Sequence, residues 1–285
     1  MMPSDCIDLY LLPTAGLTPG DMARLAALLD STETDRAARL RDTDARAGFV
    51  AAHGLLRLAL SRHRPSVAPA SWRFAAGPFG KPGIVADSPP DRPVPPLYAP
   101  GSDAGAAGIA AEGIAAEGTP SFSLTHTAGL VAVAVATGRD VGVDAEAVVA
   151  DAATSAVAAT FCTPVELAAF DALAEADRLA RFFTLWTLKE SILKAAGRGF
   201  LIPPQDVEIG FSPPAARWIG GETPWLAWHG AFGNGHHIAV CVAAMPAPPR
   251  LAVLDAGPMV RSAAEPVPLP LALDSLAVVP AGGTN

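Results

Sequence analysis

The chain has 285 residues, of which 51% are hydrophobic and 17% are charged. This is ample apolar material for one large core or two modest ones, and it excludes a mostly disordered chain. The 20 basic and 28 acidic residues give a net charge of −8, which argues against a general nucleic-acid binder because such proteins need basic surface.

Cysteine usage and the N-terminal residues predict the compartment. Cys6, Cys162 and Cys241 lie far apart with no CxxC pair, so they indicate neither a disulfide framework nor a zinc site. The N-terminus has no basic stretch before an apolar one, and the longest uncharged run, 118–138, alternates in its second half as a buried strand does. We therefore expect a cytoplasmic protein with no membrane span.

The first half of the chain is predicted to open with a strand over 5–12. Helical periodicity follows over 19–30 and again over 33–62, where apolar positions recur among arginines. Residues 86–120 are rich in proline and glycine and contain a tandem Ile-Ala-Ala-Glu-Gly repeat. Burial in such a segment does not offset the entropy lost on ordering, so we predict a flexible insertion here.

The second half is predicted to begin with a hairpin, in which 130–136 and 141–148 flank a Thr-Gly-Arg-Asp turn. A helix is expected to open at Thr163, because Thr-Pro-Val-Glu is a capping-box pattern with proline at the first helical position. Another helix is expected over 179–196. Strands are expected near 205–211, 224–230 and 236–244, and the proline-rich residues 251–285 are expected to lie outside the core.

Two carboxylates stand two residues apart on the strand predicted after the turn. Asp144 and Glu146 should project from the same face of that strand, because side chains alternate. Carboxylates so placed can share a hard cation such as Mg²⁺. The alternative is a solvated acidic strand edge, which the spacing alone favours because such triplets are common.

The helix predicted over 179–196 carries a second candidate group. Trp186, Glu190 and Lys194 share one face at helical spacing. The alternative is an ordinary surface pair between Glu190 and Lys194. Lysine is scarce in this arginine-rich chain and occurs only at positions 81, 189 and 194, and a compact ammonium is a phosphate binder that arginine does not replace well.

A third candidate is His126, which follows the hydroxyl residues Ser123 and Thr125. It could contact an anion, although a structural histidine is the more common outcome. Most arginines of residues 36–64 fit a solvated helix face. The chain has no Walker P-loop, no GxGxxG, no HExxH and no GxSxG motif, which removes the basis for a P-loop kinase, dehydrogenase, zinc protease or α/β-hydrolase assignment.

In chain order, these motifs resemble the Sfp-type 4′-phosphopantetheinyl transferase family, over about residues 5–245. Each motif is weak alone, but their order and spacing together are specific. Residues 49–57 also resemble the N-terminal helix of that family. The matching segments are Gly80-Lys81-Pro82, Ser123 to Thr127, Gly142 to Glu146, and Trp186 to Ser191 with Lys194 and Gly197.

The resemblance implies an α/β (α+β) fold, a pseudo-dimer of two similar halves that each combine a small antiparallel sheet with helices. We accordingly expect an N-terminal half over 1–138 and a C-terminal half over 139–250 that carries a metal site, followed by a tail over 251–285. The length exceeds that of the trimeric class of such enzymes, so a monomer is expected.

The resemblance also implies a reaction, transfer of 4′-phosphopantetheine from coenzyme A to a serine of an apo acyl or peptidyl carrier protein, with release of 3′,5′-ADP. Glu190 would accept the serine proton directly or through a metal-bound water, the route we prefer, and Lys194 would stabilise the departing phosphate. By the same resemblance, Mg²⁺ would be held by Asp144, Glu146 and Glu190, and coenzyme A would be bound by Arg36, His53, Lys81, Thr125, His126 and Lys194.

Departures from the family pattern concern mainly the 3′-phosphate contacts. Thr125 replaces the usual serine and keeps its hydroxyl, Gly48 stands where a basic residue is expected, and His53 stands where arginine is frequent. Two other functions stay open at this point. One is a non-catalytic protein of the same fold that binds coenzyme A or a carrier, and the other is an unrelated Mg²⁺-dependent nucleotide hydrolase.

Overall fold

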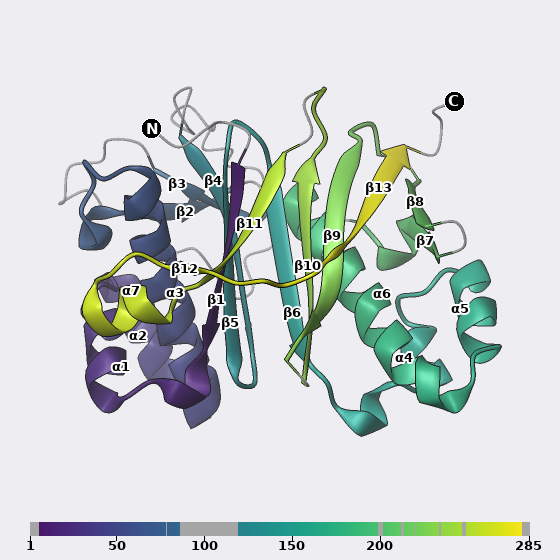
Figure 1. Cartoon of the computed structure of the whole chain (residues 1–285), viewed down its shortest axis with the longest axis horizontal. Helices are drawn as coiled ribbons and strands as arrows, with labels where there is room; N and C mark the ends of the chain where they lie inside the picture. The colour runs from purple at the N-terminus through teal and green to yellow at the C-terminus, as the bar shows by residue number, and fades with distance from the viewer. Residues whose placement is uncertain are drawn as a thin grey trace, which may run out of the picture.

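The computed structural model describes residues 6–77, 79–85, 119–198, 202–211, 214–219, 221–233, 235–246 and 249–280. Its elements form four layers: helices, a five-stranded sheet, a six-stranded sheet and further helices (Figure 1). One apolar core lies between the two sheets. A second core lies between the first sheet and its helices, and a third lies between the second sheet and its helices. This confirms the expected α/β fold, in which small sheets rich in antiparallel pairs combine with helices. Most of the predicted insertion, up to residue 118, lies outside the described residues.

The first sheet has the strand order β12-β11-β1-β5-β4. The predicted opening strand is confirmed as β1, which is buried along almost its whole length and pairs antiparallel with β5 and parallel with β11. The strands are β1 (Cys6–Pro13), β4 (Pro120–Thr127), β5 (Leu130–Thr137), β11 (Arg250–Asp255) and β12 (Val267–Pro268). A separate ribbon contains β2 (Phe74–Ala76) and β3 (Pro82–Ile84).

Helices α1 (Pro19–Ala26), α2 (Ser31–Arg39), α3 (Thr43–His63) and α7 (Gly257–Ser262) lie beside the first sheet (Figure 1). The helix predicted over 33–62 is in fact two helices. Leu40 is extended, and the Asp42 side chain accepts a hydrogen bond of 2.7 Å from the amide of Ala45, so a new helix begins. An aspartate N-cap satisfies an amide at the helix start and favours such a restart.

The second sheet has the order β6-β10-β9-β13-β8-β7. The three strands expected near 205–244 are confirmed as β7, β9 and β10, whereas β8 and β13 were not predicted. The strands are β6 (Val141–Ala147), β7 (Val207–Phe211), β8 (Pro214–Trp218), β9 (Trp225–Phe232), β10 (His236–Ala243) and β13 (Asp274–Pro280).

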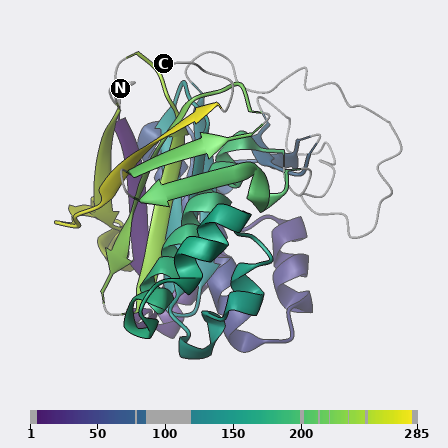
Figure 2. The same cartoon turned by 90° about the vertical axis from the view of Figure 1, so that its right-hand side faces the viewer.

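Helices α4 (Ser155–Ala158), α5 (Pro164–Asp171) and α6 (Glu175–Ala196) cover the outer face of the second sheet (Figure 2). Thr163 and Glu166 form the predicted capping box at the start of α5. Helix α6 ends at Gly197, whose φ of 67° is the left-handed conformation that glycine adopts without strain. Short 3₁₀ turns are η1 (Thr14–Gly16), η2 (Pro69–Ser71), η3 (Ala150–Ala152) and η5 (Pro204–Asp206).

The predicted hairpin over 130–148 is wrong. β5 pairs with β1 and β4, whereas β6 pairs with β10 in the other sheet. The intervening turn, in which Gly138 has a φ of 73°, carries the chain from one sheet to the next. Both strands are almost fully buried, so their apolar pattern does not specify a partner strand.

The expectation that residues 251–285 lie outside the core is also wrong. β11 and β13 add strands to the first and second sheets, and Leu254 and Leu276 are buried in the respective cores. In Figure 1 this yellow segment crosses from the helices of one half to the sheet of the other. The boundary expected at 138/139 falls in the turn before β6, and the division into halves stays a prediction.

None of the helices within the described ranges is both long and apolar enough to cross a bilayer.

Gly142 allows α6 to pack directly on β6. A side chain here would overlap the carbonyl oxygen of Ser191 and the amide nitrogen of Ala195, which are backbone atoms of α6. We predict that Gly142→Ala lowers the free energy of unfolding by about 1–3 kcal/mol, because the helix must move away from the strand. Urea unfolding measures the loss. Gly83→Ala is the control, since an added Cβ there meets nothing within 4 Å, and equal losses in both variants would contradict the prediction.

Candidate active site

The site lies along the seam between β4 and β6, the strands at which the two sheets end in the described part of the chain. The two strands are not joined by a backbone ladder. Side chains of β4 reach the backbone of β6 instead, as when the amide of Val143 donates a hydrogen bond of 3.0 Å to Ser123 Oγ. Helix α6 covers β6 from the other side through Gly142, so residues of both halves meet at this seam.

Asp144 is the residue at which three elements meet. Its side chain is buried, and its Oδ1 accepts hydrogen bonds from Lys194 Nζ on α6 at 2.6 Å and from Thr125 Oγ1 on β4 at 3.2 Å. The alternative of a solvated acidic strand edge is therefore wrong. Lys194 on α6 forms its ion pair with Asp144 on β6. The candidate residues that the sequence indicated on β4, β6 and α6 therefore belong to one site.

Glu146 and Glu190 both lie close enough to this pair to feel the charges of Asp144 and Lys194. Trp186 Nε1 donates to Glu146 Oε1 at 3.3 Å, and Thr127 Oγ1 donates to Glu146 Oε2 at 3.4 Å. Burial raises the pKa of Glu146, and the negative charge of Asp144 raises it further. Burial and the charge of Asp144 raise the pKa of Glu190 in the same way. Glu190 is consequently a stronger proton acceptor than an ordinary glutamate.

The acidic side chains have the donor chemistry that Mg²⁺ prefers. Asp144 Oδ2 is buried and makes no hydrogen bond to any described residue. Negative charges that raise one another's pKa are those that a divalent cation stabilises. Within the described ranges, however, no three His, Cys, Asp or Glu side chains are grouped as a metal site requires. Lys194 neutralises Asp144 instead, and the ligand set Asp144, Glu146 and Glu190 stays a prediction.

The predicted cation cluster of the first half gathers around His126. Desolvation lowers the pKa of His126, and the positive charges of His53, Lys194 and Arg36 lower it further. Its ring packs against α3, where a Cβ added at Gly48 would lie 2.6 Å from His126 Cδ2. Position 48, where the family pattern has a basic residue, is therefore glycine for a steric reason. Any side chain there would collide with the imidazole of His126.

His53 is held by a buried network that the sequence interpretation missed. Its Nδ1 is 2.8 Å from Glu33 Oε1, and its ring stacks on Phe49 with 4.0 Å between centroids. Arg57, which is fully buried, forms an ion pair with Glu33. The available signal was the capping box of α2, in which Asp30 and Glu33 cap the helix reciprocally.

This network predicts a pH dependence of stability. Burial alone would raise the pKa of Glu33, but hydrogen bonding to His53 and the charge of Arg57 outweigh it and lower the pKa from 4.5 to about 2. The ionised carboxylate therefore stabilises the fold above pH 4.5, and this contribution is lost as the pH falls toward 2. Glu33→Gln should be less stable than the parent by roughly 3 kcal/mol at pH 7.

Urea unfolding at a series of pH values between 7 and 3 checks this, and the stability difference should narrow as the pH falls below 4.5. Asp35→Asn, an exposed acid on the same helix, is the matched control. A difference that widens toward acidic pH would contradict the assignment.

Lys81 lies at the C-terminal end of α6. Its Nζ donates to Ala195 O at 2.8 Å and pairs with Asp140 Oδ1 at 2.7 Å, and its side chain packs on Gly197. Cations at a helix C-terminus are stabilising. The structure thus assigns Lys81 a role in joining the two halves, and its predicted contact with coenzyme A stays a prediction.

Lys189 does not face the seam. It is 1% exposed, forms an ion pair with Glu166 at 2.8 Å and donates to the carbonyl oxygens of Pro204 and Val207. The expectation that the scarce lysines bind phosphate is therefore wrong for Lys189. Glu166 caps α5 and also accepts from the amide of Ile209 at 2.6 Å, so the pair ties α5, α6 and β7 together.

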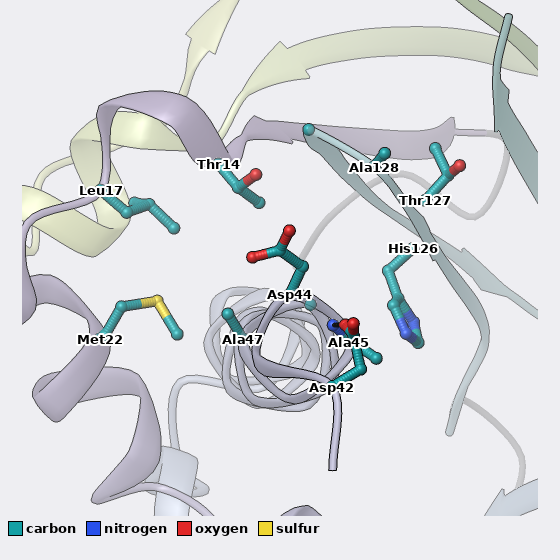
Figure 3. Close-up of a pocket in the computed structure, with 12 residues that line it drawn as sticks. Thr14, Leu17, Met22, Asp42, Asp44, Ala45, Ala47, His126, Thr127 and Ala128 are labelled. Carbon is teal, nitrogen blue, oxygen red and sulfur yellow. Dashed lines mark hydrogen bonds between the residues drawn. The ribbon is translucent and has the colours of Figure 1, made fainter. Parts of the chain in front are cut away.

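A cavity of about 600 Å³ opens beside His126. Figure 3 shows Leu17 and Met22 on one side, His126 on the other and Asp44 between them. Because Asp42 and Asp44 line this space, their charges disfavour phosphate. Lys194, by contrast, lies at the seam.

Comparison with known proteins supplies the family. A family model described as the 4′-phosphopantetheinyl transferase superfamily matches residues 140–241, the span that contains Asp144, Glu146, Glu190 and Lys194. Over this span the chain is similar to the 4′-phosphopantetheinyl transferase superfamily. The resemblance inferred from the motifs is thereby confirmed.

Two relatives extend the similarity of this chain beyond the matched span. It is 27% identical over 245 residues to a Synechocystis protein provisionally named a 4′-phosphopantetheinyl transferase, covering 82% of this chain and 85% of the relative. It is 28% identical over 222 residues to the 4′-phosphopantetheinyl transferase HetI of Nostoc, covering 78% of this chain and 81% of the relative. The chain therefore resembles these proteins over most of its length.

Proposed function

We propose that the protein transfers the 4′-phosphopantetheine group of coenzyme A to a serine of an apo acyl or peptidyl carrier protein and releases 3′,5′-ADP. The observation that carries the proposal is the meeting of Asp144 and Lys194 at 2.6 Å, with two carboxylates of raised pKa and the His126 cluster around them. Similarity to the 4′-phosphopantetheinyl transferase superfamily supports the general activity.

In the proposed reaction, the carrier serine Oγ attacks the phosphorus that bears pantetheine, and the bond from that phosphorus to the oxygen of 3′,5′-ADP breaks. Glu190 takes the serine proton directly or through a water molecule, the route we prefer, and its raised pKa suits it to accept that proton. Lys194 neutralises the charge that develops on the leaving phosphate. Arg36 and His53 supply positive charge for the phosphates, and His126 and Thr125 offer hydrogen bonds to them.

Mg²⁺ is proposed as the metal, held by Asp144, Glu146 and Glu190. When bound it would neutralise the diphosphate oxygens and act as a Lewis acid. The support for this proposal is the buried Asp144 Oδ2, which makes no hydrogen bond to the described residues, together with the raised pKa values of the two glutamates.

Mass spectrometry of an apo carrier panel tests the proposal. The purified protein with coenzyme A and Mg²⁺ should add about 340 Da to at least one carrier, as expected for metal-assisted transfer of phosphopantetheine. Chelation of Mg²⁺ should stop the reaction, and its return should restore it.

Other outcomes identify the rival functions. Binding of coenzyme A without transfer to any carrier would indicate a non-catalytic binding protein, and release of 3′,5′-ADP without a carrier would indicate a hydrolase. We further propose a monomeric enzyme of the cytoplasm. Sedimentation of the purified chain at the mass of a dimer or trimer would overturn the monomer.

A further inference from the structure

The outer edge of β6 is satisfied by side chains of β4. The amide of Val143 donates to Ser123 Oγ at 3.0 Å, and the amide of Ala147 donates to Thr127 Oγ1 at 3.0 Å. Both bonds join residues 20 apart in sequence, so β4 and β6 run in the same direction in one register. Unpaired amides at a strand edge need such partners.

A third hydroxyl completes this arrangement, which we call the hydroxyl ladder (Ser123, Thr125 and Thr127). Alternate residues of a strand share a face, and Thr125, between the other two, donates to Asp144 Oδ1 at 3.2 Å. Beyond the end of the ladder, His236 Nε2 donates to the carbonyl oxygen of Ala128 at 2.7 Å. The two halves are thus joined by a row of directional contacts along the seam.

The ladder bears on catalysis because both halves contribute side chains to the site. Asp144 and Glu146 belong to β6, whereas His126 belongs to β4. The core between the sheets is apolar, and apolar packing is non-directional. Hydrogen bonds are directional, so they define the register that aligns the carboxylates with the cations.

We propose that Ser123 and Thr127 are positioning residues, whose hydroxyls hold β6 in register with β4 and so place Asp144 and Glu146 against the cations of the first half. The catalytic part of this inference rests on the proposed function. The structural part, protection of the Val143 and Ala147 amides, does not.

Hydrogen exchange and steady-state kinetics test the ladder together. In Ser123→Ala the Val143 amide should exchange about fivefold to tenfold faster, the factor expected for one lost hydrogen bond. With coenzyme A, Mg²⁺ and an apo carrier, kcat should fall about tenfold or more while the KM for coenzyme A changes less than about threefold. Ser123→Thr, which keeps the hydroxyl, should restore both.

Ser121→Ala is the matched control. This serine lies on the same strand, but its hydroxyl donates to the carbonyl oxygens of Ala136 and Arg139, within its own hairpin and the turn that follows. It should leave the Val143 amide and kcat unchanged. Thr127→Val and Thr127→Ser repeat the two tests at the half-buried end of the ladder, where the Ala147 amide is the probe. If Ser123→Ala does not fold, these two variants decide whether the ladder positions β6.

Three results would overturn the inference: unchanged exchange at Val143 in Ser123→Ala, an equal loss in Ser121→Ala, or faster exchange with kcat unchanged. If the parent protein modifies no carrier, the proposed function and the catalytic part of the inference fail together. The exchange data still decide whether the ladder holds the register.

Discussion

Asp144→Asn is expected to lower kcat for carrier modification by about 10²- to 10³-fold, the effect of removing one preorganised electrostatic contact from an active site. The amide keeps the shape of the side chain but removes the charge that pairs with Lys194 at 2.6 Å. It also removes a donor from the proposed Mg²⁺ site. Binding of coenzyme A should persist, because the cations around His126 are untouched.

A second readout does not depend on turnover. Burial is the main cause of the raised pKa of Glu146 and of Glu190, and the negative charge of Asp144 is the second cause. Removing that charge should therefore lower both pKa values. Side-chain NMR titration of the glutamates measures this. Asp151→Asn, an exposed acid just beyond β6, should change neither kcat nor the two pKa values. Full activity of Asp144→Asn would remove Asp144 from the mechanism.

Lys189→Met is expected to lower the free energy of unfolding by about 3–5 kcal/mol, the range measured when one partner of a buried ion pair is removed. Glu166 would keep its two backbone donors but lose its counter-charge, and the carbonyl oxygens of Pro204 and Val207 would each lose a donor. Urea unfolding measures the change.

The comparison variant for this pair is Glu265→Gln. Glu265 forms an ion pair with Arg62, but its side chain is 81% exposed, so the change should stay within about 1 kcal/mol. Because Lys189 is buried away from the seam, kcat per folded molecule should be unaffected at low temperature. Loss of kcat in a fully stable Lys189→Met would instead make this lysine part of the phosphate site.

Elements marked by local signals were predictable. The start of α5 follows from its capping box, the end of α6 from Gly197, and β1 from a short apolar run. Strand partners were not predictable for β5 and β6, because both strands are buried on nearly all positions and their residue pattern does not indicate which strand lies beside them. β11 was missed because its partner is β1, at the other end of the chain.

The supports of the site were harder to predict than its charged groups. Glu33 and Arg57 lie on different helices, and only folding turns them into the network that holds His53. Ser123 and Thr127 gave no signal of their own, because a hydroxyl that accepts from a distant backbone amide looks in sequence like any other polar residue.

Spacing and composition were enough to single out the two acids on one strand and a scarce lysine on a helix, and the motifs in chain order resembled a known family. Which of these groups touch was decided by the fold. Lys194 bonds to Asp144 across 50 residues of sequence, and Thr125 does so across 19. Periodicity indicates which face of a helix or strand a side chain occupies. Which other element packs against that face depends on contacts between distant segments, and local sequence patterns do not report those contacts.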